Sequence, residues 1–173
     1  MVSDIDAEFA SQLRQLQYMS NITILLYTRK NLANYYWVNI ADREVRLTGI
    51  ISQSNLVRYP SAKGFFTYVS IYLPRDDKLL MVDSSQMLKF ILQELCKMDI
   101  SLKESEIFEF YVTRTEYAQP IYIADNDLVL SSLVTPISGI YVLNNHSILP
   151  EDRGLNNIVC KAKILSNLIP RAH

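Results

Sequence analysis

The spacing of apolar residues changes its period twice along this 173-residue chain, and that change limits the folds open to it. Apolar and polar residues alternate over residues 21–28, the pattern of a strand with one buried face. Over residues 83–98 the apolar residues recur at helical spacing, which predicts one long helix with a buried side. Alternation returns over residues 107–115. Strands in series with a long helix between them favour an α+β fold on an antiparallel sheet.

The other elements predicted for residues 1–116 fit this architecture. Further strands are predicted over residues 35–40, 45–57 and 65–73, with Gly49 as a possible bulge. A short amphipathic helix is predicted over residues 4–17, where Ser3 begins an S-x-x-D capping signature. We therefore expect residues 1–116 to form an antiparallel sheet of about five strands with a long packed helix.

Residues 117–173 follow a different pattern. Residues 117–122 are a short extended piece interrupted by a proline, and residues 139–143 are a continuous apolar run. Such a run is typical of a strand buried on both faces of a parallel sheet. A turn and a helix over about residues 155–169 come after it. This strand–turn–helix needs neighbouring strands that the preceding antiparallel sheet does not supply, so it predicts a second, incomplete domain.

Charge and glycine content exclude several classes of function. Seventeen basic and eighteen acidic residues leave a net charge of −1, which gives no electrostatic footprint for nucleic acid. The four glycines are too far apart for a G-x-G-x-x-G or Walker phosphate loop. No apolar run approaches the roughly 20 residues that span a bilayer, and the acidic first residues do not resemble a signal peptide. A cytoplasmic location is the resulting expectation, and Cys96 and Cys160 are predicted to be buried core thiols.

Residues suited to catalysis or metal binding are scarce. His146 is the only histidine other than the terminal one, and its position in a turn predicts an exposed loop residue. Two separated cysteines and one internal histidine do not form a zinc ligand set. The sequence therefore identifies no catalytic residue and predicts no metal site.

Residues 150–157 are the exception, because they lie between the apolar run and the C-terminal helix. Open α/β sheets bind ligands at this position, where free N–H groups and the helix dipole favour an anionic group. Gly154 would allow close approach of a ligand to the backbone. Glu151 and Asp152 are candidates to accept hydrogen bonds from hydroxyls, and Arg153 is a candidate to pair with a phosphate or carboxylate. The alternative is an ordinary helix start.

Residues 117–122, 135–144 and 148–156 resemble the C-terminal part of FAD-dependent oxidoreductases of the flavin amine oxidase, protoporphyrinogen oxidase and phytoene desaturase superfamily. The preceding segments resemble that family's substrate domain, in the same order. The resemblance implies that the turn and helix start lie against the flavin and its ribityl-phosphate arm. The residues concerned are Glu151, Asp152, Arg153, Gly154 and Asn156. The family usually has a second glycine in this helix, where Ala162 stands here.

The same resemblance implies that these residues correspond to a substrate domain (1–116) and the last strand and helix of an FAD domain (117–173). The family's dinucleotide fingerprint precedes the substrate domain and is absent from these residues. We therefore expect a C-terminal portion of an oxidoreductase, which by itself is inactive and binds FAD weakly or not at all. Its expected partners are a small-molecule substrate and an N-terminal FAD-binding domain, or a chain that supplies one. In the intact protein, FAD would accept a hydride from a C–N or C–C bond of an apolar or cyclic substrate.

Aromatic residues of the predicted sheet are candidates for the substrate pocket, although core packing would explain them equally well. These residues are Tyr36, Trp37, Phe66 and Tyr68. The alternative function is a non-catalytic binding or dimerisation module, in which the strand at 139–143 pairs with another chain.

Overall fold

The computed structural model describes residues 6–57, 63–122, 133–148, 151 and 154–170. The chain divides into two compact units. The sheet unit is Met19–Ala118, and the terminal unit combines Met1–Tyr18 with Gln119–His173.

The sheet unit contains a five-stranded sheet in the order β2-β3-β4-β1-β5, which confirms the predicted α+β class. Its strands are β1 (Gln17–Thr28), β2 (Trp37–Asn39), β3 (Gly49–Ser52), β4 (Phe65–Pro74) and β5 (Ile107–Ile121). The pairs β1–β4, β3–β4 and β2–β3 are antiparallel, and Ile24 lies opposite Val69 at the centre of the sheet. The long pairing of β1 with β4 therefore lies inside the sheet, with the other strands on either side of it.

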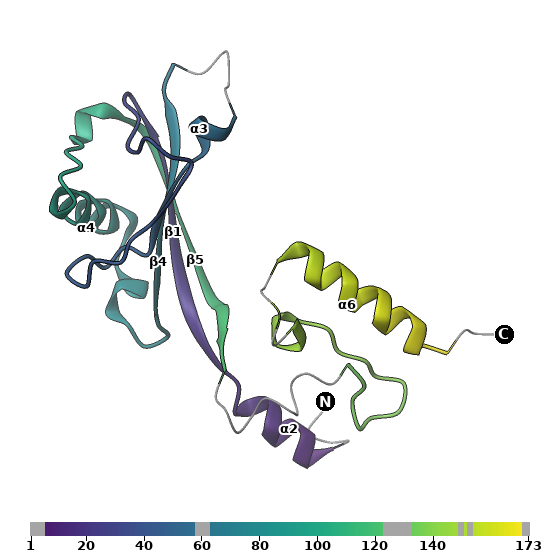
Figure 1. Cartoon of the computed structure of the whole chain (residues 1–173). Coiled ribbons are helices and arrows are strands. Elements are labelled where there is room, and N and C mark those ends of the chain that lie inside the picture. Colours follow the sequence, from purple (N-terminus) through teal and green to yellow (C-terminus); the bar gives the residue numbers. More distant parts are fainter. Residues whose placement is uncertain (1–5, 58–62, 123–132, 149–150, 152–153, 171–173) are drawn as a thin grey trace. The chain divides into compact units, whose positions relative to one another are not determined.

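Helix α4 (Ser84–Lys97) covers one face of the sheet (Figure 1). Asp83 caps it by accepting a hydrogen bond from the Gln86 N–H, and the Gln86 side chain accepts from the Asp83 N–H. This reciprocal capping box fixes where the helix starts. Its apolar side meets the inward-facing residues of β1, β3 and β4. The fully buried residues at this contact are Ile22, Ile24, Leu26, Ile50, Val69, Met87, Ile91 and Leu95.

Some predicted bounds in the sheet unit were wrong. The predicted strand over 45–57 is limited to β3, and its last residues form the short helix α3 (Gln53–Leu56). Gly49 pairs regularly with Asn39 and Ser70, so it is not a bulge. In contrast, β5 is longer than predicted and continues through Pro120. As the last strand in the sheet order, β5 has a free edge, which tolerates a residue without an N–H.

Short helices and loops make up the described part of the terminal unit. Helix α2 (Ala7–Arg14) lies within the predicted range and is capped by Asp6, which accepts from the Phe9 N–H at 2.8 Å. Ser3, the predicted cap, lies outside the described residues. A 3-10 helix (Asn145–Ile148) and helix α6 (Leu155–Leu168) follow towards the C-terminus. The predicted C-terminal helix is thus present.

The predicted strand at 139–143 is not formed. Gly139 has a φ of +78° in a turn, Ile140 is 38% exposed, and Tyr141 makes only an isolated antiparallel bridge with Val134. A strand needs a ladder of hydrogen bonds to a neighbour, and the described residues provide none beyond this bridge. The apolar run therefore lacks the partners that its composition requires.

Both cysteines were predicted to be buried, and this was wrong. Cys96 and Cys160 are free and exposed, because each lies on the outer side of its helix rather than on the packed side. Among the described residues, no helix combines the length and apolar character needed to cross a membrane.

Candidate functional site

The face of the sheet opposite α4 carries polar and aromatic side chains. Along β4 the inward positions are buried, while the alternate positions from Phe66 to Tyr72 are partly exposed. The same alternation along β1 places Asn21, Thr23 and Tyr27 on the outer side. We refer to this surface of the sheet unit as the open face. One sheet thus separates an aliphatic core from a surface rich in hydrogen-bonding and aromatic groups.

The open face is hollowed near its β2 edge. The hollow has a volume of about 310 Å³, at the lower end of the range typical of small-molecule sites. It is lined by Asn21, Thr23, Trp37, Asn39, Thr48, Gly49, Ile51, Tyr68, Ser70 and Tyr72. These residues come from β1, β2, β3 and β4 and from the residue before β3. The hollow therefore extends across four strands, from the short edge strand β2 to β1.

Asn21 organises the polar part of the hollow. Its Nδ2 donates to Ser70 Oγ at 2.8 Å and to the Ile71 carbonyl oxygen at 3.0 Å. Its Oδ1 accepts from Thr23 Oγ1 at 2.6 Å. The amide orientation of Asn21 is therefore fixed, and with it the hydroxyl groups of Thr23 and Ser70.

Trp37 forms the aromatic rim of the hollow. Its indole Nε1 donates to Asn39 Oδ1 at 2.8 Å, and the side chain is 56% exposed. Tyr36 meets the indole ring edge-on, with ring centroids 6.4 Å apart. A large exposed aromatic surface that is held in place by a hydrogen bond is suited to stack against a flat ligand.

The four predicted substrate residues lie at or near this face. Trp37 and Tyr68 line the hollow, and Tyr36 contacts Trp37. Phe66 on β4 stacks on Tyr27 of β1 with ring centroids 4.5 Å apart. Sequence reasoning selected aromatic residues and missed the polar ones. The signal was present, because Asn21, Thr23 and Ser70 occupy the positions that alternate with the apolar core residues.

Charged groups lie outside the hollow. On β5, the Tyr111 hydroxyl donates to Glu109 at 2.9 Å, and this hydrogen bond raises the pKa of Tyr111. Arg75 pairs with Glu116 and donates to the Tyr117 hydroxyl at 2.8 Å. Arg75 and Glu116 are therefore paired with each other, and Glu109 is hydrogen-bonded to Tyr111.

The predicted cofactor residues lie at the start of α6. Gly154 is the N-cap with an extended backbone, and a Cβ added there would meet no atom within 4 Å. Asn156 and Glu151 are exposed, while Asp152 and Arg153 lie outside the described residues. Among the described residues no side chain caps this helix, whose first N–H groups have no partner within the helix itself. An accessible helix start with space in front of it fits a phosphate group.

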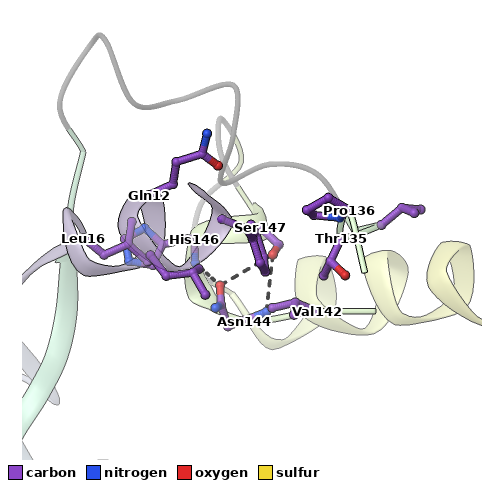
Figure 2. A pocket seen from close by; sticks show the side chains of 11 residues that line it. Gln12, Leu16, Thr135, Pro136, Val142, Asn144, His146 and Ser147 are labelled. Carbon is purple, nitrogen blue, oxygen red and sulfur yellow. Dashed lines mark hydrogen bonds between the residues drawn. The ribbon is translucent and has the colours of Figure 1, made fainter. Parts of the chain in front are cut away.

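The terminal unit contains a second hollow, of about 200 Å³, between α2 and residues 134–147 (Figure 2). His146 lies in its wall and is only 1% exposed, so its predicted exposure was wrong. The imidazole packs edge-on against Tyr18 and Tyr122, with centroids 5.0 and 5.7 Å away. Neither ring nitrogen has a hydrogen-bond partner among the described residues. Burial lowers the pKa of His146, which keeps the ring neutral.

Comparison with known proteins was made at the level of sequence and of structure. No model of a known protein family matches the sequence, and no curated protein matches it. Solved structures do match, and they define the class of fold: one found within larger oxidoreductases.

The individual structures share low sequence identity with this chain. A protein described as a protoporphyrinogen oxidase, from Exiguobacterium sp. 255-15, has a TM-score of 0.67 at 16% identity over 91% of this chain. Reduced UDP-galactopyranose mutase has a TM-score of 0.58 at 14% identity over 72% of this chain. An oxidoreductase from Methanosarcina mazei has a TM-score of 0.54 at 18% identity over 83%.

The chain spans only 36%, 27% and 33% of the lengths of these three proteins. At such identities the likeness is one of fold. It confirms the fold expected from the sequence resemblance.

Proposed function

We propose that this chain is the substrate-binding and C-terminal portion of an FAD-dependent oxidoreductase of the amine oxidase type. The observation that carries the proposal is the open face. Within the sheet unit, one face of the sheet is packed under α4 and the other presents the hollow, in a fold shared with larger oxidoreductases. A ligand-sized hollow on such a sheet is the default site for a small molecule.

In this proposal, bound FAD would supply the redox chemistry: it would accept a hydride from a C–H group of a C–N or C–C bond of the substrate, which becomes a double bond as its other atom loses a proton. The residues of this chain bind and orient. Trp37 and Tyr68 provide flat apolar contacts, and the Asn39 amide and the Ser70 hydroxyl provide hydrogen bonds. Phe66 and Tyr36 hold the neighbouring aromatic side chains in position. Fixed contacts of this kind align the bond that reacts.

The start of α6 is the proposed contact with the cofactor. The N–H groups after Gly154 are oriented to receive a phosphate of the ribityl arm, together with Asn156. Glu151, Asp152 and Arg153 are assigned to the same contact by the sequence resemblance. Because the dinucleotide fingerprint lies outside these residues, a separate FAD-binding domain or a partner chain must supply the pyrophosphate site. We accordingly propose that this chain alone binds FAD weakly or not at all.

A reducing, cytoplasmic setting is part of this proposal. Cys96 and Cys160 are both free and exposed, which suits a compartment that keeps thiols reduced.

The test begins with the coding sequence upstream of the Met1 codon. An in-frame strand, a G-x-G-x-x-G motif and a helix would support the proposal, and the whole protein would then be purified and its flavin content measured by visible absorbance. A stop codon directly upstream, with no such segment in an adjacent reading frame, would refute it.

In the whole protein, Gly154→Leu is expected to lose most of the bound flavin, because the new side chain occupies the space in front of the helix start. The sheet should remain folded, since no described residue beyond the chain neighbours of Gly154 lies within 4 Å of the added Cβ. Ser166→Leu is the matched control, because it adds a leucine to an exposed position near the other end of α6. Equal flavin content in the two variants would contradict the role of Gly154.

A non-catalytic binding or dimerisation module remains the second candidate. The strand that first suggested it is not formed, but α6 exposes several apolar side chains. These are Leu155, Val159, Ile164 and Leu168, each at least 46% exposed. Sedimentation of the chain at several concentrations tests this candidate. A concentration-independent monomer would exclude self-association.

A further inference from the structure

We infer that the hollow on the open face takes an uncharged, flat ring compound that presents a carbonyl-type hydrogen-bond acceptor. This inference rests on the proposed function and narrows it to a substrate class. It follows from three properties of the lining residues: their lack of charge, the direction of their free hydrogen bonds, and their aromatic surface.

The first property is the absence of charge. None of the ten residues that line the hollow is Asp, Glu, Lys, Arg or His. A charged ligand that enters a hollow of this kind loses hydration and gains no ion pair in return. Beyond the lining, Arg75 and Glu116 are paired with each other. The lining therefore selects against anions and cations alike.

The second property is the direction of the free hydrogen bonds. Asn39 Oδ1 accepts from Trp37, so the Nδ2 group is left to donate, and it has no partner among the described residues. Ser70 Oγ accepts from Asn21, so its own proton is also left to donate. Both groups offer donors to the hollow. A carbonyl oxygen on the ligand satisfies them, whereas a ligand that carries only donors does not.

The third property is the aromatic surface. Trp37 on β2 and Tyr68 on β4 belong to strands that flank β3, and Ile51 lies opposite both of them in the strand register. This row of flat and apolar groups matches the face of a fused ring system rather than an extended chain.

The inferred ligand differs in charge from the molecules named in the descriptions of two proteins of similar fold. The names of those proteins refer to a nucleoside-diphosphate sugar and to a porphyrinogen, and both molecules carry ionised groups. Such groups need cationic partners, which the lining of this hollow lacks. A shared fold with a different lining indicates a different substrate class.

The test compares two ligands of almost equal shape, methyl 2-naphthyl ketone and 2-naphthoate. The full chain contains one tryptophan, so nitrogen–proton correlation spectra show one indole N–H signal, which comes from Trp37 in the hollow. Each ligand is titrated and the shift of that signal gives its affinity. We expect the neutral ketone to bind at least about tenfold more tightly than the carboxylate.

A charge variant tests the cause. Asn39→Lys places a cation on the exposed edge strand β2 and is expected to raise the affinity for 2-naphthoate while lowering that for the ketone. Gln93→Lys adds the same charge to an exposed position of α4, on the covered face, and is expected to leave both affinities unchanged.

The outcomes distinguish a wrong ligand class from a wrong proposed function. Equal or tighter binding of 2-naphthoate to the unaltered chain overturns the uncharged class, while the proposed function stands because a ring still occupies the open face. An indole signal that neither ligand moves overturns the proposed function, and the inference falls with it. An effect of Gln93→Lys as large as that of Asn39→Lys overturns the assignment of selectivity to the hollow.

Discussion

Gly64 immediately precedes β4, and replacing it with alanine provides a direct test of the packing in the sheet unit. A Cβ at this position would collide with the carbonyl oxygen of Thr28 and lie only 2.8 Å from Phe108 Cε2 and 3.0 Å from Tyr27 Cε2. The Thr28 carbonyl belongs to the backbone of β1 at its pairing with Phe65. It cannot retreat without disturbing the β1–β4 ladder, so the strain remains in the folded state.

The expected loss in the free energy of unfolding is about 2 to 3 kcal/mol, the upper part of the range for overpacked sites. That loss lowers the melting temperature by roughly 4 to 12 °C for a chain of this size. Urea unfolding followed by Trp37 fluorescence measures it, since the only tryptophan reports on the sheet unit. The midpoint should fall while the dependence on urea stays constant.

Gly49→Ala is the comparison variant in the same sheet. Its Cβ would lie 3.2 Å from the Val38 carbonyl oxygen, on the three-residue strand β2. A slight movement of this edge strand relieves the contact, and alanine gains about 0.5 to 1 kcal/mol over glycine within a strand. We therefore expect a net change below about 1 kcal/mol. Equal unfolding midpoints for the two alanine variants would refute the reasoning.

Two further predictions concern buried polar groups. Glu94 is 3% exposed and accepts from the Arg46 N–H at 2.6 Å and from Lys97 Nζ at 2.7 Å. Glu94→Leu should therefore cost about 1 to 3 kcal/mol in urea unfolding, and Glu94→Gln, which keeps an acceptor, should cost less. The pKa of His146 is lowered by burial, so its stabilising contribution is complete above its unfolded pKa of about 6.5 and is lost as the pH falls below that value. The protection factors of the α2 amides, which are corrected for the intrinsic pH dependence of exchange, should accordingly fall between about pH 7 and pH 5, and His146→Phe should remove that fall; an unchanged fall in the variant would contradict the assignment.

The parts of the fold that the sequence predicts well are those whose signals are local. The apolar face of α4 and its cap at Asp83 lie within one stretch of residues, and the alternation along β1 and β4 needs no knowledge of distant partners. The misplaced features depend on distant residues. His146 is buried because Tyr18 and Tyr122 pack against it, and the apolar run at 139–143 is not a strand because, among the described residues, its pairing is limited to one isolated bridge. Neither the burial of His146 nor the pairing of residues 139–143 can be predicted from the local sequence pattern.

The polar residues of the candidate site also follow from a local signal, the alternation along β1 and β4. Alternation on β1 and β4 places every second residue under α4, and it thereby places the residues between them on the open face. A sheet with two buried faces would have apolar residues at both sets of positions. Here the outward set includes Asn21, Thr23 and Ser70, which hydrogen-bond to one another across two strands. The polar network is therefore a consequence of the pattern that forms the core, and it gives the hollow an uncharged, hydrogen-bonding lining.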